Sequence, residues 1–164
     1  GKTMISHRNL MKEDLEIISS FPLNVEELFF ISPRFEYPLT PDQIIKILEN
    51  RLSPTVIIDT STQIAIAYAN LYDMNHEDSV CWLGNVIVSP DYRGKGVSDY
   101  LINTMMDKAR NEHDIKKMKL FCHNTNTRAL IFYCNQGFKP CGYKIIMNQD
   151  NKKIVSIEME RELI

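Results

Sequence analysis

The chain has 164 residues, of which 44% are hydrophobic and 24% charged, and its formal net charge is −2 with a pI of about 6.1. A chain of this length typically forms one domain that buries roughly 70% of its unfolded surface. The near-neutral charge excludes a general affinity for nucleic acid or anionic membranes, and no apolar run reaches the ~20 residues of a membrane helix.

The N-terminus and the cysteines indicate the cellular setting. No secretory pattern is present, and residues 1–3 precede Met4, so we expect a cloning remnant followed by a single domain over 4–164. The cysteines form no CxxC pair, which favours reduced thiols and a cytoplasmic protein. No companion pair accompanies Cys122 and His123, so we expect no metal site.

An opening strand and three helices are predicted in the first third of the chain. Asn24 and Glu27 stand at capping-box spacing before one helix. Thr40 and Gln43 have the same spacing before the next predicted helix, and Pro41 suits its first position. The elements predicted here are a strand over 4–10 and helices over 12–21, 25–31 and 40–52.

Beyond this point apolar residues recur at every second position, which predicts strands. A hairpin is expected first, with Ile64, Ile66, Tyr68 and Tyr72 on one face of its second arm. Gly84 lies inside the following strand, where a glycine often marks a bulge or a close backbone approach. The predicted strands are 55–59, 63–73 and 80–88.

The second half alternates helices with strands and ends in a strand pair. Gly137 is a typical helix C-cap. The mixed order predicts an α+β fold, an α/β sandwich with a largely antiparallel central sheet. The elements predicted here are helices over 96–110 and 126–136 and strands over 118–123, 138–147 and 153–160.

A basic, glycine-containing turn, Arg93–Ser98, joins a predicted strand to a predicted helix. Backbone N–H groups at a helix N-terminus bind anions, and glycines let a phosphate approach them closely. A flexible turn without a ligand is the plain alternative. The spacing differs from the dinucleotide fingerprint and from a Walker loop, so a nucleotide-binding protein is the weaker interpretation.

A second segment supports the interpretation of this turn as a phosphate-binding site. Asn126 is followed seven residues later by Tyr133 and then by Gly137 and Phe138. With Arg93–Ser98, in this order, it resembles the GNAT superfamily of acetyl-CoA-dependent N-acetyltransferases. The family's Arg/Gln-x-x-Gly-x-Gly/Ala signature reads Arg-Gly-Lys-Gly-Val-Ser here, a departure at the last position only, and the strand layout matches over nearly the whole chain.

The resemblance implies a GNAT-like sheet with a splayed pair of central strands, and acetyl-CoA as co-substrate. The pantetheine arm would pair with the strand backbone, and the pyrophosphate would bind at the helix start. The implied cofactor-binding residues are Val86, Ile87, Val88, Arg93, Gly94, Lys95, Gly96, Val97, Ser98, Asp99 and Asn126.

The resemblance also implies direct attack of an amine on the thioester, with a backbone N–H near Val88 stabilising the oxyanion. Tyr133 is the expected proton donor to the departing thiolate. Reference pKa values of about 10 for tyrosine and about 8.5 for a thiol make full transfer uphill by about 2 kcal/mol, so the hydroxyl would chiefly hydrogen-bond the sulfur. The plain alternatives are a core aromatic for Tyr133 and an N-cap for Asn126.

The general base stays open. Phe121 and Trp82 occupy the two positions at which some relatives carry a glutamate. His123, Asp73 and Glu77 are the remaining candidates for a base acting through water.

Acidic residues dominate the two variable segments, 24–39 and 72–79, and favour a cationic acceptor. We therefore expect an N-acetyltransferase acting on a primary amine of a small molecule or peptide. The alternative is a non-catalytic acyl-CoA-binding or regulatory module of the same fold. Neither nucleic acid nor membrane is expected as a partner, and a homodimer stays open. The acidic residues are Glu26, Glu27, Glu36, Asp73, Glu77 and Asp78, against Arg34 alone.

Overall fold

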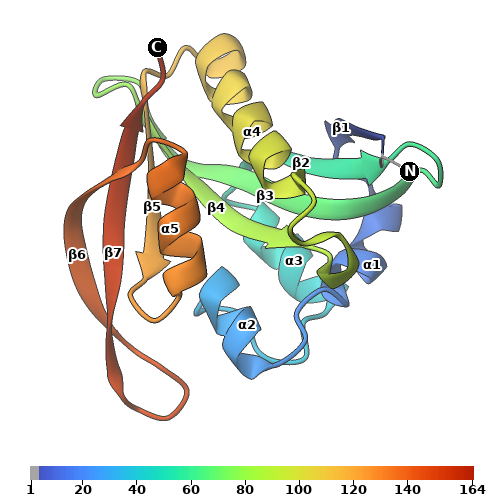
Figure 1. Ribbon diagram of the computed structural model, residues 1–164, viewed down its shortest axis with the longest axis horizontal. Coiled ribbons are helices and arrows are strands. Elements are labelled where there is room, and N and C mark those ends of the chain that lie inside the picture. Colours follow the sequence, from blue (N-terminus) through green and yellow to red (C-terminus); the bar gives the residue numbers. More distant parts are fainter. Residues whose placement is uncertain (1–3) are drawn as a thin grey trace.

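The computed structural model describes residues 4–164, so the expectation for residues 1–3 lies outside the described part. Seven strands form one sheet in the order β1-β2-β3-β4-β5-β7-β6, in which only β4 and β5 are parallel (Figure 1). The predicted α+β fold with a largely antiparallel sheet is confirmed. The strands are β1 (Ile5–Asn9), β2 (Leu52–Asp59), β3 (Ile64–Asn75), β4 (Val80–Val88), β5 (Lys117–His123), β6 (Lys139–Met147) and β7 (Lys153–Glu162).

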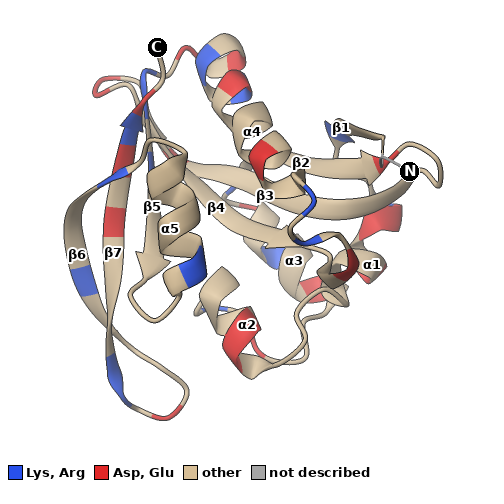
Figure 2. Cartoon of the chain, viewed as in Figure 1, with Lys and Arg blue, Asp and Glu red and all other residues tan. Residues whose placement is uncertain are grey.

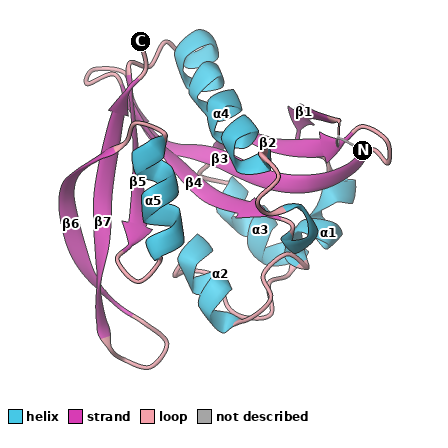
Figure 3. Cartoon of the chain, viewed as in Figure 1, coloured by secondary structure: helices cyan, strands magenta, loops and turns pink. Residues whose placement is uncertain are grey.

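Helices cover both faces of the sheet (Figure 3). One buried cluster joins α4 and α5 to β3, β4 and β5, and a second joins α1, α2 and α3 to β2 and β3. None of the helices within 4–164 is both long and apolar enough to cross a membrane. The helices are α1 (Leu15–Ser19), α2 (Val25–Ile31), α3 (Pro41–Leu48), α4 (Val97–His113) and α5 (Thr127–Asn135), with 3-10 turns η1 (Lys12–Asp14) and η2 (Pro90–Tyr92).

Two predicted helices are shorter in the structure. The one expected over 12–21 splits into η1 and α1, because the Asp14 carboxylate accepts hydrogen bonds from Arg8 at 2.7 and 2.8 Å and from the Met11 N–H at 2.7 Å. The one expected over 40–52 ends at Leu48, and β2 already begins at Leu52.

The two predicted helix caps differ in outcome. Asn24 caps α2 as predicted, since its side chain accepts from the Glu27 N–H at 2.9 Å. Thr40 stands at the N-cap position of α3, but its side chain makes no capping bond. Its hydroxyl instead accepts from the Gln43 amide at 3.2 Å, because that amide also binds the carbonyl of Pro38 and folds back over the preceding loop.

The predicted face of β3 is wrong. A register shift opposite Ile57 and Ile58 of β2 inserts one extra residue into β3. As a result Ile66 packs in the cluster with α4, whereas Tyr68 packs in the cluster with α1–α3. Ile64 is exposed at the end of the strand. A bulge of this kind shifts side chains to the other face, and period-two alternation cannot reveal it.

The central strands β4 and β5 diverge, as the resemblance implies. They pair only over Val80–Trp82 and Lys117–Lys119, and Figure 1 shows β4 running away from β5 beyond that point. On its other side β4 stays paired with β3 through a bulge at Gly84 and Asn85, where Asn85 has a left-handed φ of 53°. Asparagine tolerates this conformation better than most residues. The β5-facing edge of β4 is therefore open from Leu83 onward.

Gly84 is required by a close approach. A Cβ at this position would lie 2.2 Å from Arg51 Nη1 and 2.9 Å from Asn70 Oδ1. Arg51 donates to Asn70 Oδ1 at 3.2 Å, and the Asn70 amide donates to Tyr68 Oη and to Asn85 Oδ1, both at 2.9 Å. This hydrogen-bonded network ties the turn after α3 to the bulge of β4.

Gly84→Ala is therefore expected to displace Arg51 and to lower the free energy of unfolding by about 1–3 kcal/mol, since the methyl group meets Arg51, Asn70 and Tyr72 and breaks the network that they form. Gly142→Ala in β6 is the matched control, because a Cβ there meets Glu158 at an ordinary 3.7 Å. The control should change stability by less than about 0.5 kcal/mol. Urea unfolding of both variants measures the difference, and equal stabilities would contradict the close approach.

Candidate functional site

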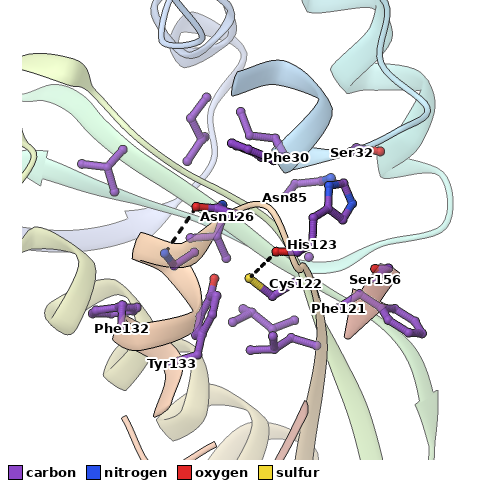
Figure 4. A pocket seen from close by; sticks show the side chains of 18 of the residues that line it. Phe30, Ser32, Asn85, Phe121, Cys122, His123, Asn126, Phe132, Tyr133 and Ser156 are labelled. Carbon is purple, nitrogen blue, oxygen red and sulfur yellow. Dashed lines mark hydrogen bonds between the residues drawn. The ribbon is translucent and has the colours of Figure 1, made fainter. Parts of the chain in front are cut away.

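A cleft of about 1130 Å³ opens where β4 and β5 part. Its walls are the open edge of β4, the end of β5, α5, the start of α4 and the C-terminal part of α2. Figure 4 shows Tyr133 and Phe132 entering this space from α5, with His123 and Phe30 on the opposite side.

At one end of the cleft the main chain of residues 93–98 has the geometry of an anion-binding site, called the cradle below. Gly94 and Gly96 have left-handed φ values of 75° and 79°, and no atom lies within 4 Å of where a Cβ would be. The first backbone bond of α4 runs from Tyr100 N to Gly96 O, so the N–H groups of the first turn have no intrahelical acceptor. Such groups at the positive end of the helix dipole suit the phosphates of coenzyme A.

The side chains around the cradle are largely engaged elsewhere. The Arg93 guanidinium binds Glu27 of α2 at 2.9 and 3.2 Å, and its Nε donates to Val88 O at 3.3 Å. This ion pair holds the pKa of Glu27 below its usual range. Lys95 lies over the ring of Tyr92 at 5.6 Å. The groups that the cradle offers to an anion are thus primarily backbone N–H groups, although Figure 2 shows basic residues in this loop.

Val97, Ser98 and Asp99, the other residues predicted at the start of α4, differ in what their side chains contact. Val97 is buried in the core with α4, so only its N–H faces the cradle. The Asp99 carboxylate accepts a hydrogen bond from Gln136 and thereby joins α4 to the end of α5. Ser98 lines the cleft.

Asn126 begins α5 as a helix cap. Its side-chain oxygen accepts from the Ala129 N–H at 3.3 Å (Figure 4). Its own N–H donates to His123 O at 2.9 Å. The residue also lines the cleft, so its amide NH₂ stays available there. The plain capping role is present, and it places α5 against the end of β5.

The predicted strand segment borders the same cleft. Val86, Ile87 and Val88 all line it, and Ile87 and Val88 pair with β3 on the opposite edge. Their cleft-facing edge has no strand partner within the described chain. Unpaired backbone donors and acceptors of this kind suit an extended amide-containing arm, because a buried polar group needs a partner.

Tyr133 is buried in the apolar wall of the cleft. It packs edge-on against Phe132 and Phe138, with ring centroids 5.4 and 5.8 Å apart. Burial, with a smaller contribution from Cys122, raises the pKa of its hydroxyl well above the usual value. The hydroxyl therefore stays protonated and is available as a donor. Burial likewise raises the pKa of the Cys122 thiol to about 12, so this cysteine is no nucleophile.

His123 lies at the end of β5 beside two rings of α2. The ring centroids of Phe29 and Phe30 are 4.8 and 5.9 Å away. Burial, and then the charge of Lys144, lowers the pKa of His123 to about 4. Nδ1 of this ring and Oγ of its neighbour Ser156 on β7 are buried without a hydrogen-bond partner among the described residues. Both residues line the cleft, so its wall carries uncharged polar groups that lack partners.

The candidate bases differ in whether they line the cleft. His123 and Asp73 line the cleft, but Glu77 does not. The two positions that carry a glutamate in some relatives hold a stacked aromatic pair here, Trp82 and Phe121, with centroids 4.8 Å apart. No carboxylate base stands at either place.

The charges of the cleft differ from the sequence expectation. Of the six acidic residues in the variable segments only Glu27 and Asp73 line the cleft, and Glu27 is paired with Arg93. Arg34, Arg51 and Lys144 line it as well. Sequence reasoning missed Arg51 and Lys144 because they come from the turn before β2 and from β6, far from any motif.

The sequence model of the acetyltransferase (GNAT) family matches residues 22–138. No curated protein sequence matches the chain.

Solved structures share the fold. A spermidine N-acetyltransferase from Vibrio cholerae, in complex with CoA and spermine, superposes with a TM-score of 0.79 at 21% identity over 97% of this chain and 95% of its own. A protein assigned as a phosphinothricin N-acetyltransferase gives 0.79 at 20% identity over 98% and 99%.

Gly96→Ala should weaken binding of acetyl-CoA at least about tenfold, because a methyl group would occupy the phosphate approach and strain the left-handed backbone. Gly137→Ala is the control, since it has a left-handed φ of 89° but lies outside the cleft. Isothermal titration of acetyl-CoA compares the two. Equal weakening in both variants would count against the cradle.

The lowered pKa of His123 makes stability depend on pH. His123 binds a proton near pH 6.5 in the unfolded state but only near pH 4 in the folded state. Its contribution to the free energy of unfolding is therefore fully present above pH 6.5 and is lost as the pH falls toward 4, by up to about 3 kcal/mol. His123→Phe should flatten this part of the profile, whereas His76→Gln on an exposed loop should leave it unchanged. Unfolding measured between pH 7 and 4.5 tests this, and an unaltered slope in His123→Phe would contradict the assignment.

Proposed function

The chain belongs to the GNAT acetyltransferase family, and we propose that it transfers the acetyl group of acetyl-CoA to the primary amine of a small molecule. One observation carries this: the phosphate cradle, the open edge of β4 and the Tyr133 hydroxyl line a single continuous cleft. The cradle and the tyrosine lie at positions that the two sequence motifs identify independently.

The residues of the cleft fit acetyl-CoA, which supplies an activated acyl group as a thioester. The first-turn N–H groups of α4, with the left-handed glycines 94 and 96, hold the pyrophosphate. The open edge of β4 over Val86–Val88 holds the pantetheine arm by backbone hydrogen bonds. A backbone N–H of this edge also serves as the donor to the carbonyl oxygen as negative charge develops on it.

Tyr133 stabilises the departing sulfur by donating a hydrogen bond. Its raised pKa keeps the hydroxyl protonated at all working pH values. The same shift makes complete proton transfer to a thiolate less favourable than the reference values give, because the tyrosinate would be buried in an apolar wall. A hydrogen bond to the sulfur, rather than full protonation, is therefore the role of this residue.

The amine has to lose a proton before it attacks. His123 is neutral at physiological pH and does not repel a substrate, but its low pKa makes it a weak base. Removal of the proton through water suits a cleft wall that offers His123, Ser156 and Asp73 as polar groups. No single carboxylate carries this step.

Tyr133→Phe is expected to lower kcat about 10²-fold or more and to leave acetyl-CoA affinity unchanged, since only the leaving-group hydrogen bond is lost. Tyr143→Phe on the exposed face of β6 is the control and should retain full activity. A thiol-release assay with saturating acetyl-CoA measures both rates. Full activity in Tyr133→Phe would remove the tyrosine from the reaction.

The function itself is tested by thiol release with acetyl-CoA against a panel of primary amines, alongside thermal shift with acetyl-CoA alone. Turnover on any amine establishes the transferase. Stabilisation by acetyl-CoA without turnover on any amine of the panel would favour a non-catalytic acyl-CoA-binding module. Absence of stabilisation would overturn the cradle and the proposed function together.

A further inference from the structure

Arg51 lies in the wall of the cleft and, among residues 4–164, has no carboxylate partner within ion-pair distance. Its guanidinium donates to Asn70 at 3.2 Å and stacks over the ring of Tyr72, with Cζ 4.1 Å from the centroid. It also passes so close to Gly84 that a Cβ there would collide with Nη1. These contacts place the charge against β4 at the bulge.

Arg51 makes no ion pair in the described part of the chain. Among residues 4–164 no acidic side chain forms an ion pair with it, whereas Arg8, Arg93 and Arg110 each have one. Partial burial lowers the pKa of Arg51, and the charge of Arg34 also lowers it. Tyr72, Tyr68 and the charge of Asp73 act in the opposite direction, but the net pKa stays below the usual value. A partly desolvated guanidinium without a counter-ion is unfavourable by itself, and an anion with two oxygens suits its geometry.

The position of Arg51 is next to the place where an amine has to attack. Gly84, beside which it lies, precedes Val86 by only two residues, across the bulge of β4. The pantetheine arm is expected along β4 from Val86 onward, so the thioester ends near the bulge. An amine whose carboxylate lies a few bonds away spans the gap between the guanidinium and this point.

Two further basic residues, Arg34 and Lys144, line this region of the cleft. Arg34 lies near enough to lower the pKa of Arg51, and Lys144 lies near enough to lower that of His123. Lys144 Nζ stands 4.0 Å from the centroid of the Phe121 ring. Asp73 is the one carboxylate that lines the cleft in this region. A polyamine with several positive charges would meet repulsion here, because a carboxylate-rich lining is missing.

Given acetyl transfer as proposed above, we infer that the acceptor is a primary amine that also carries a carboxylate, as an amino acid does, and that Arg51 binds this carboxylate. The positively charged side chains of this region then have two roles. They hold the acid group of the acceptor, and their field lowers the pKa of a nearby ammonium group, which eases the loss of its proton in a site without a glutamate base.

The first experiment needs no variant. Thiol release is measured with L-methionine and L-glutamate, with the α-amide of each, and with spermidine. The amides keep the amine and the side chain but lack the α-carboxylate, and their lower amine pKa would by itself make them faster. We expect kcat/KM to be at least about tenfold higher for an amino acid than for its amide, because a charge-assisted hydrogen bond is lost.

The second experiment removes the guanidinium. Arg51→Gln should raise KM for the amino acid about 10- to 100-fold, with little change for its amide. Arg51→Lys should restore part of the affinity. Arg110→Gln on the outer side of α4, where Arg110 pairs with Asp107, is the matched control and should behave as the wild type. Titration of acetyl-CoA verifies that each variant keeps the cofactor site.

The outcomes separate the two proposals. Preference for the carboxylated acceptors, lost in Arg51→Gln, supports both. Turnover on the amides or on spermidine at equal or higher kcat/KM leaves the transferase in place and overturns the carboxylate site. An Arg51→Gln variant that still binds acetyl-CoA and still prefers amino acids would also overturn it. No turnover on any of these amines overturns this inference together with the choice of acceptor in the proposed function.

Discussion

The separation of β4 from β5 after three paired residues is the constraint on which the rest of this molecule depends. A sheet that stops pairing in its middle leaves backbone donors and acceptors without partners, which is unfavourable in a buried place. Here the opening is covered by α2 and α5 and bordered by the first turn of α4, so the free groups face a cleft instead of bulk solvent. The unpaired edge is thereby a site for an extended ligand.

The opening is kept in place by polar and apolar contacts of different origin. On one side the network from Arg51 through Asn70 to Asn85 fixes the bulge of β4. On the other, α5 packs its aromatic residues against β5 and is joined to α4 by the bond between Asp99 and Gln136. The Glu27–Arg93 pair adds a link from α2 to the phosphate loop. These contacts therefore join the walls of the cleft to one another.

Several local predictions failed for the same reason. The faces of β3, the cap at Thr40 and the start of β2 all depend on contacts with segments distant in the chain. Strand alternation assumes an uninterrupted ladder, and a bulge set by the neighbouring strand breaks that assumption. Helix caps compete with other hydrogen bonds, as the Gln43 amide does at Thr40.

The sequence by itself determined the order of helices and strands, the glycine turn before α4 and the pair of motifs at Arg93–Ser98 and Asn126–Phe138, because these are properties of adjacent residues. Only the tertiary structure decided the charge of the cleft. Arg51 and Lys144 come from two segments far apart in the chain, and of the six acidic residues in the variable segments only Glu27 and Asp73 line the cleft. Which charges share one cavity is set by strand order and helix packing, and these long-range relations leave no local pattern in the sequence.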